Sequence, residues 1–328
     1  MRNMSRVVVA ACALLMLVSL STAWSTGGGE SKGGKQVVLG YTPLSMGIAY
    51  FNDVVVGIQK KAKELGVKVV IRDPQLDAGK QFTAVEDLIT AGCNVIAICS
   101  IDIATAQSAV KYAKEKKVPV ISHISKFDGA DAYVSLSEYD YGFAAGKGGA
   151  DYILKNMGGK ANVAILDADD LGGDLLLRGK GLQEGVLSGG PGIKVVARTT
   201  AWQEDKALNA MEAILKEHPE VNFVVTSNEP GAYGALAAAE AANRKDIRIS
   251  AIGSEDRQLD LIAAGKIVHG IDPSPIWTGE KIVEYAVKMV RGEKFDKESM
   301  VPFGKVTPDN AAQIKTDKAK VKAEVGMK

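Results

Sequence analysis

From residue 36 onward, short runs rich in Val and Ile alternate with longer amphipathic stretches. This alternation is typical of parallel sheets whose strands are joined by helices on both faces. Several of the runs are apolar throughout, which indicates strands that are buried on both sides. We predict strands at residues 37–41, 67–72, 95–99, 118–123, 162–167, 194–198, 223–226, 247–252 and 268–272.

The same pattern occurs twice along the chain. Residues 82–122 and 208–253 each read as a helix, a turn, a buried strand, a polar loop, an Ala-rich helix and a further strand. The stretches 57–70 and 181–196 correspond in the same way, as helix, turn and strand. The pattern favours a duplicated βαβ unit. A chance likeness between two α/β stretches is the alternative.

A chain of 328 residues exceeds the usual size of one domain, so two lobes of about 130 residues each are the simplest arrangement. The sequence predicts an α/β fold of two similar Rossmann-like lobes with parallel sheets, joined by a three-strand hinge. We place lobe 1 at residues 36–138 plus 273–301, and lobe 2 at residues 139–272 plus 302–328.

The first 23 residues read as a secretory signal peptide. Arg2 and Arg6 precede an apolar run over residues 7–20, and small residues follow up to Ala23. This run is shorter than the roughly 20 residues that a membrane-spanning helix needs. We expect cleavage after Ala23 and export to the periplasm or another extracytoplasmic space. Retention of the segment as a membrane anchor is the alternative.

Residues 24–35 are rich in Gly and Ser and read as a flexible tether. Cys12 follows Val-Ala-Ala, which superficially resembles a lipoprotein cleavage site, but the apolar run continues beyond it. We therefore do not expect a lipid anchor at Cys12. Cys93 and Cys99 stand near the start and the end of one predicted strand, about 20 Å apart, whereas a disulfide needs less than about 7 Å. Both are predicted to be free, buried thiols.

In open parallel sheets, ligands bind beyond the carboxyl ends of the strands. Two such lobes that face each other form a cleft, and the loops that follow the strands enter it. These loops are expected at residues 42–51, 100–104, 123–128, 168–174, 200–205, 227–233, 253–256 and 272–276.

These loops carry little that suits catalysis. The chain contains no Gly-x-Ser-x-Gly elbow, no Walker-type phosphate loop and no Gly-x-Gly-x-x-Gly turn after the first strand. Of the three histidines, only His123 ends a strand at the predicted cleft, and no Cys or His cluster offers a metal three ligands. Asp167, Asp169 and Asp170 suit acid-base work or a hard cation, but more readily act as hydrogen-bond acceptors or caps. We predict a protein that is not an enzyme and uses no metal or cofactor.

The same loops suit carbohydrate recognition. Rings at strand ends can stack on the C–H edges of a sugar, and polar side chains can bond to its hydroxyls. Packing in the core is the alternative for each ring, and one of the adjacent Tyr50 and Phe51 is expected to face the cleft. Arg178 can donate a planar fork of N–H groups, and we expect Asp170 or Glu255 near it. The candidate ligand-binding residues are Tyr50, Phe51, Asp102, His123, Asp170, Arg178, Trp202, Asn228, Glu229, Glu255 and Asp272, with Tyr233 as a further ring.

Charge narrows the partners. The chain has 40 basic and 39 acidic side chains, and loss of Arg2 and Arg6 would leave 38 against 39. Such a balance predicts no nucleic-acid partner. In the predicted cleft loops acids outnumber bases, so a neutral polyol fits better than an anion. A cationic ligand is left open.

Stretches along nearly the whole mature chain resemble the type I periplasmic sugar-binding proteins of the ribose-binding kind. In order, these are VVLGYTPLSMGIAYFNDVVVGIQKKAKELG, VPVISHISKFDG, LLLRGKGLQEGV, VVTSNEPGAYGAL, ISAIGSEDRQLDLIAAGKI and EKIVEYAVKMVRGEK. The resemblance implies lobes that close on a sugar or polyol and deliver it to the membrane permease of an ABC transporter, with signalling to a chemoreceptor in some members. For the site it implies paired rings at Tyr50 and Phe51, an arginine at Arg178, a stacking ring at Trp202, an asparagine at Asn228 and a hinge-side acid at Glu255.

The chain also departs from ribose binders. An Asp-Arg pair after the fourth strand is replaced by Ile124 and Ser125, a glutamine by Pro273, and an aromatic residue by Ser254. The resemblance therefore implies a pocket for another ligand: a different pentose, a hexose, a polyol, inositol, or a furanosyl-type autoinducer with a signalling role.

Two other classes of protein remain as alternatives. A repressor of the lactose-repressor type would need a helix-turn-helix where the signal peptide stands. A secreted enzyme that acts on sugars would return its ligand chemically changed.

Overall fold

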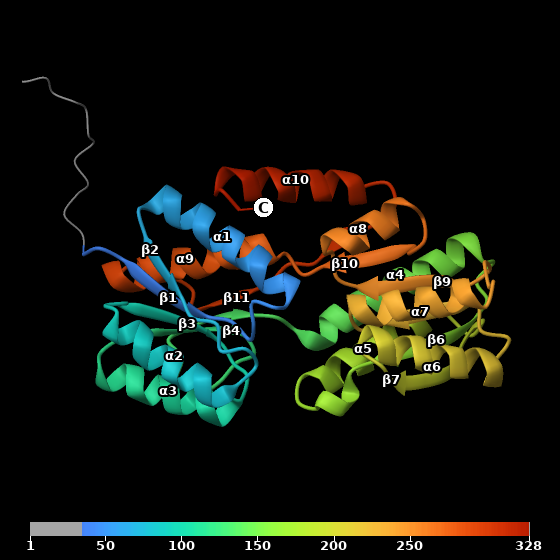
Figure 1. The fold of residues 1–328 in the computed structure, drawn as a ribbon, viewed down its shortest axis with the longest axis horizontal. Coiled ribbons are helices and arrows are strands. Elements are labelled where there is room, and N and C mark those ends of the chain that lie inside the picture. The colour runs from blue at the N-terminus through green and yellow to red at the C-terminus, as the bar shows by residue number, and fades with distance from the viewer. Residues whose placement is uncertain (1–34, 328) are drawn as a thin grey trace, which may run out of the picture. The chain divides into compact units, whose positions relative to one another are not determined.

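A computed structural model describes residues 35–327 of the chain (Figure 1). The predicted signal peptide, Cys12 and nearly all of the predicted tether lie outside the described residues. Within residues 35–327, no helix is both long enough and apolar enough to cross a membrane.

Twelve strands of the described chain form two sheets of six. The first has the order β11-β5-β4-β3-β1-β2 and the second the order β12-β10-β9-β8-β6-β7. If the strands of each sheet are numbered from 1 to 6 in chain order, both sheets have the spatial order 6-5-4-3-1-2. This identity of strand order supports the predicted duplication. The strands are β1 (Val38–Thr42), β2 (Lys68–Ile71), β3 (Val95–Cys99), β4 (Val120–Ile124), β5 (Ala132–Ser135), β6 (Ala161–Asp167), β7 (Ile193–Thr200), β8 (Phe223–Thr226), β9 (Arg248–Ile252), β10 (His269–Asp272), β11 (Glu298–Met300) and β12 (Gly304–Val306).

The predicted fold class is confirmed: the chain has two α/β lobes built on parallel sheets. Pairing is parallel throughout, except that the edge strand β12 runs antiparallel to β10. Strands β1–β5 and β11 share one sheet while β6–β10 and β12 share the other, so the chain passes between the sheets three times.

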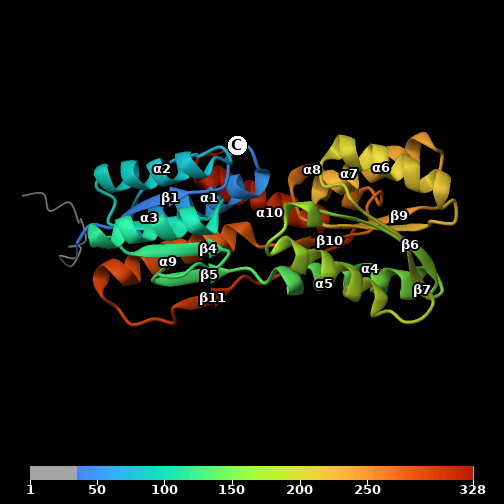
Figure 2. The same ribbon diagram turned by 90° about the horizontal axis from the view of Figure 1, so that it is seen from below.

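Helices cover both faces of each sheet (Figure 2). α1 and α9 pack on one face of the first sheet, and α2 and α3 on the other. α4 and α5 pack on one face of the second sheet, with α6, α7 and α8 on the other. The helices are α1 (Ala49–Leu65), α2 (Ala78–Thr90), α3 (Ile103–Glu115), α4 (Glu138–Asn156), α5 (Leu175–Leu187), α6 (Glu204–Glu217), α7 (Glu229–Ala241), α8 (Asp256–Ala263), α9 (Pro275–Arg291) and α10 (Ala311–Glu324), with a 3₁₀ turn at Asp169–Leu171.

The nine predicted strands all form; β3 and β8 have the predicted bounds, and the ends of the other seven differ by at most two residues. Three strands were missed: β5, β11 and β12 have only three or four residues, and none is a continuous apolar run. Cys93 lies just before β3 and Cys99 ends it, and both are free and buried, as predicted.

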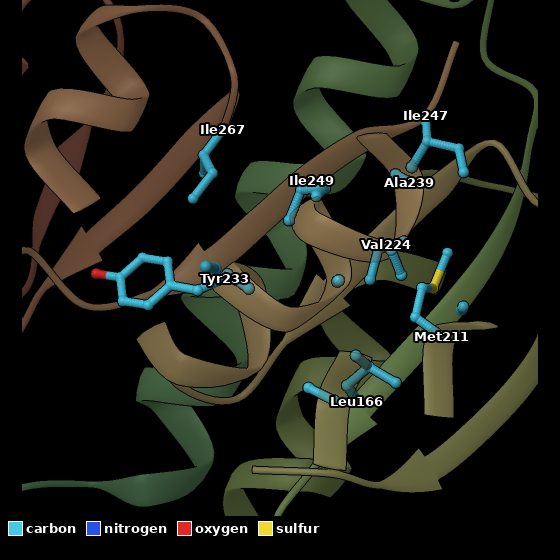
Figure 3. Packing of buried hydrophobic residues seen from close by; sticks show 14 of the residues in the cluster. Leu166, Met211, Val224, Tyr233, Ala239, Ile247, Ile249 and Ile267 are labelled. Atoms are coloured by element: carbon cyan, nitrogen blue, oxygen red, sulfur yellow. The ribbon is translucent and has the colours of Figure 1, made fainter. Parts of the chain in front are cut away.

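Apolar side chains from β6, β8 and β9 meet those of α6 and α7 in one core cluster of the second lobe (Figure 3). Leu166, Met211, Val224 and Ile249 are at most 1% exposed there. The ring of Tyr233 belongs to the same cluster, so for this residue core packing applies instead of ligand stacking.

The helix α10 contacts both α8, which packs on the second sheet, and α1, which packs on the first (Figure 1). Its Lys318 is buried, and the ammonium lies 3.2 Å from Asp53 Oδ2 in α1. The same ammonium donates to the carbonyl and the hydroxyl of Ser254, at 2.8 and 2.9 Å. Lys322 approaches the other oxygen of Asp53 at 3.1 Å. One buried carboxylate in lobe 1 is therefore held by two cations of the C-terminal helix.

We expect Lys318→Met to lower the free energy of unfolding by about 3 kcal/mol, because the Asp53 carboxylate loses a buried partner while Lys322 still faces it. The matched control is Lys320→Met on the same helix, where an exposed pair with Asp317 is lost and the change should stay within about 0.5 kcal/mol. Urea unfolding of both variants measures the difference, and equal losses would contradict a special role for Lys318.

Candidate functional site

A cavity of about 360 Å³ lies where loops from the carboxyl ends of both sheets meet. Its position agrees with the rule that ligands of open parallel sheets bind beyond the carboxyl edge. Lobe 1 contributes Leu44, Ile48, Tyr50, Phe51, Ile124 and Leu136, lobe 2 contributes Tyr141, Leu175, Arg178, Trp202, Asn228, Glu229, Pro230 and Ile252, and Pro273 follows β10 at the crossing between them.

Six of the predicted ligand-binding residues line this cavity: Tyr50, Phe51, Arg178, Trp202, Asn228 and Glu229. Five do not: Asp102, His123, Asp170, Glu255 and Asp272. Each of these five side chains either is exposed away from the cavity or already makes hydrogen bonds within the protein.

His123 stands behind the cavity and is fully buried. Its Nδ1 lies 3.1 Å from the Tyr41 hydroxyl and its Nε2 lies 3.2 Å from the Tyr50 hydroxyl. Burial lowers the pKa of His123 to about 3, so the imidazole is neutral at physiological pH. The histidine therefore fixes the ring of Tyr50 from behind and does not itself line the cavity. Phe51 is 1% exposed in the lobe 1 core, whereas Tyr50 is only partly buried.

Arg178 in α5 is held by Glu138, a residue that was not predicted from the sequence. Its Nε and Nη2 donate to the two carboxylate oxygens of Glu138, at 2.5 and 2.8 Å, and its Nη1 donates to the carbonyl of Ser227 at 3.3 Å. The expected neighbours Asp170 and Glu255 are not among the hydrogen-bond partners of Arg178. A guanidinium has five N–H groups, so two remain for a ligand.

Glu138 could not be found from the sequence, because it follows the short strand β5 that was itself missed. Its carboxylate is buried at the start of α4, beside the cavity. The guanidinium of Arg178 also lies 5.3 Å from the ring centre of Tyr141. Its plane is thus fixed by an ion pair on one side and a ring on the other.

Asn228 begins α7, and its Oδ1 accepts a hydrogen bond from the amide of Gly231 at 3.0 Å. Its Nδ2 donates to the carbonyl of Trp202 at 2.7 Å, which ties the loop after β7 to the start of α7. One amide N–H of Asn228 remains for a ligand. The side chain therefore positions Trp202 as well as lining the cavity.

Among residues 35–327, no cationic side chain lies at hydrogen-bonding distance from the carboxylate of Glu229. Its Oε1 accepts from the amide of Ser254 at 3.2 Å. Burial, and then the charge of Glu255, raise the pKa of Glu229 to about 7. Gly253 makes room for this carboxylate: it adopts φ +114°, and a Cβ there would stand 1.8 Å from Oε1. Only glycine fits both demands at position 253.

Asp102 corresponds to Asn228 in the other lobe as the cap of the helix after the third strand. Its Oδ1 accepts from both the amide and the hydroxyl of Thr105, each at 2.7 Å, and these bonds lower the pKa of Asp102. The prediction that it binds ligand is not supported by this geometry, because the carboxylate is exposed and serves the helix terminus.

The remaining acids are also engaged elsewhere. Asp170 is exposed on the 3₁₀ turn, while its neighbours Asp167 and Asp169 pair with Arg198. Glu255 accepts a hydrogen bond from the Tyr233 hydroxyl. Asp272 accepts from the hydroxyl of Ser254 at 2.7 Å and from the amide of Ser274 at 3.1 Å. Among residues 35–327, no cluster of three or more His, Cys, Asp or Glu side chains could hold a metal ion.

Comparison with known proteins decides the family. The model of the periplasmic binding protein domain matches residues 39–294. The chain belongs to the periplasmic binding protein family. Its family membership and its fold class confirm the resemblance predicted from the sequence.

Among curated relatives of this periplasmic binding protein, the ribose import binding protein RbsB of Salmonella typhimurium is 30% identical over 239 residues, which are 73% of this chain and 79% of that protein. The xylitol-binding protein of Mycolicibacterium smegmatis is 26% identical over 77% of this chain and 72% of that protein. An ABC transporter periplasmic solute binding protein from Actinobacillus succinogenes, solved with bound D-allose, superposes with a TM-score of 0.77 at 22% identity, covering 85% of this chain and all of that one. This last likeness shows the fold.

Glu229 gives the unliganded protein a pH-dependent stability. Between about pH 4.5 and the raised pKa of about 7, the folded protein keeps a proton that the unfolded chain has lost, so ionisation destabilises the fold as pH rises. Glu229→Gln cannot ionise. We expect its advantage over the wild type to grow by about 2 kcal/mol between about pH 5 and about pH 8, a figure reduced for the partial exposure of the side chain.

Urea unfolding at both pH values measures this difference. Glu115→Gln, at an exposed position on α3, is the matched control and should track the wild type. Parallel pH profiles for Glu229→Gln and wild type would show that Glu229 ionises without penalty.

Proposed function

We propose that this protein is an extracytoplasmic solute-binding component of an ABC transporter that binds a small neutral sugar or polyol in the cavity between its lobes. The observation that carries the proposal is the cavity itself, which places aromatic rings beside an arginine, an asparagine and an acid at the carboxyl edges of two parallel sheets. Relatives named for ribose, xylitol and D-apiose support this ligand class.

The charge of the cavity supports a neutral ligand over an anion. The cavity lining contains two ionisable charged side chains, Arg178 and Glu229. The charge of Arg178 is neutralised by its ion pair with Glu138. An anionic ligand would meet an acid with no free cation to offset it, which is unfavourable in a partly buried site. A hydroxyl can donate to Glu229 whether or not a charge is present.

Three further parts of the function are proposals of the same kind. The two lobes, residues 36–138 plus 273–301 and residues 139–272 plus 302–328, close on the ligand, and the division of strands between the two sheets supports these limits. The ligand is passed unchanged to a membrane permease, so no chemical step is involved. Residues 1–23 direct export to the periplasm and are removed, as the family membership supports.

A thermal-shift screen of purified mature protein tests the ligand class. A ligand that binds only the folded state raises stability by about 2.7 kcal/mol at a hundred times its dissociation constant. Neutral monosaccharides or polyols should give the largest shifts, with affinities in the micromolar range or tighter, at about −8 kcal/mol or better. A screen in which amino acids or phosphate compounds stabilise the protein while sugars and polyols do nothing would overturn the proposal.

Trp202→Ala should weaken binding of the best screened sugar at least about tenfold, because the ring that lines the cavity is lost, while the melting temperature changes little. The matched control is Trp277→Ala in α9, whose ring lies outside this cavity and packs against the lobe 1 core. That variant should lose stability and keep its affinity. Titration calorimetry with melts of both variants distinguishes the two effects, and an unchanged affinity in Trp202→Ala would remove Trp202 from the site.

A further inference from the structure

The two walls of the cavity differ in chemistry. The wall from lobe 1 is formed by four aliphatic side chains, Leu44, Ile48, Ile124 and Leu136, with the rings of Tyr50 and Phe51. The hydroxyl of Tyr50, the one polar side-chain group on this wall, is already hydrogen-bonded to His123. Lobe 1 therefore offers a ligand apolar surface and almost no free hydrogen-bonding group.

Apart from the Tyr50 hydroxyl, the polar side-chain groups of the lining come from lobe 2. The indole N–H of Trp202 has no partner within the described residues, and the Tyr141 hydroxyl donates to the carbonyl of Ile271 at 3.4 Å. Arg178 keeps two free N–H groups and Asn228 keeps one, because Glu138, Ser227 and Trp202 take the others. Glu229 has a second carboxylate oxygen beyond the one that accepts from Ser254. A sugar hydroxyl turned toward lobe 2 finds several partners, whereas the lining side chains of lobe 1 offer it only the Tyr50 hydroxyl, which is already bonded to His123.

The backbone of Ile124 supports a special role for the lobe 1 wall. This residue ends β4 with φ 67°, in the left-handed region, where a β-branched side chain is strained. Asn or Asp would adopt this conformation more easily. Strain of this kind persists where the surrounding structure maintains it, typically at functional sites. An isoleucine held there at the cavity indicates that an apolar surface is needed at this point.

We propose that the ligand is a deoxygenated sugar or polyol, with an edge that lacks a hydroxyl against Ile124 and Leu136 and its remaining hydroxyls on Arg178, Asn228 and Glu229. The inference rests on the proposed function and narrows its ligand class. A hydroxyl restored on the apolar edge loses its water and gains no partner in the cavity. The fully hydroxylated counterpart of each ligand is therefore bound more weakly.

Matched pairs of sugars test this directly by titration calorimetry on the mature protein: L-fucose with L-galactose, L-rhamnose with L-mannose, 2-deoxy-D-ribose with D-ribose, and any sugar from the thermal screen with its deoxy counterpart. In the pairs that bind, the deoxy member should bind at least about tenfold tighter. Equal or tighter binding of the hydroxylated members would overturn this inference and leave the proposed function intact. If no sugar or polyol binds at all, the proposed function fails and this inference fails with it.

Ile124→Asn tests the wall itself. Asparagine is at ease in the left-handed conformation and supplies a donor and an acceptor, so the fold should persist while the deoxy preference falls at least about tenfold. Ile103→Asn, at a 43% exposed position outside the cavity, is the matched control and should keep the wild-type preference. A folded Ile124→Asn variant with an unchanged ratio of affinities would show that Ile124 does not face the ligand.

Discussion

Parallel pairing of nearly all the strands determines where this protein can act. Most crossovers return the chain through a helix, although β4 leads to its parallel neighbour β5 through a loop. The carboxyl ends of β1, β4, β7 and β8 lie at the edges from which the cavity is built. The helices α1 and α7, which follow β1 and β8, begin with residues that line the cavity, and Asn228 caps α7 there. Asn228 shows how one side chain can serve both purposes: its Oδ1 caps α7, one N–H donates to the carbonyl of Trp202, and the other N–H remains available to a ligand.

Elements marked by a periodic or continuous pattern of apolar residues could be predicted from the sequence. Elements and contacts that depend on partners far away in the chain could not. The buried β3, with five apolar residues in succession, follows directly from hydrophobicity. The edge strands β11 and β12 depend on pairing with β5 and β10, and their own residues carry no signal. In the site, Arg178 was recognisable as a donor, but its partner Glu138 lies 40 residues earlier in the chain, just after the missed strand β5. Asp102 and Asn228 looked alike as polar residues at strand ends, and only their surroundings separate them.

The ion pair between Arg178 and Glu138 explains how a small number of polar groups can serve a cavity. A free arginine would lose conformational entropy when a ligand bound, whereas here the guanidinium is fixed beforehand by Glu138, Ser227 and the ring of Tyr141. Pairing also removes net charge from the donor, which reduces its attraction for anions. The acid that stays without a cation, Glu229, then contributes most of the electrostatic character of the site.

Ser254 uses each of its polar groups on a different element. Its amide donates to Glu229 in the cavity, its hydroxyl donates to Asp272 at the crossing between sheets, and its carbonyl accepts from Lys318 of α10. Only two hydrogen bonds therefore separate the cavity from the C-terminal helix. A reporter group fused to α10 is attached to the same short chain of hydrogen bonds, so it is coupled to the cavity and would itself perturb the position of Glu229.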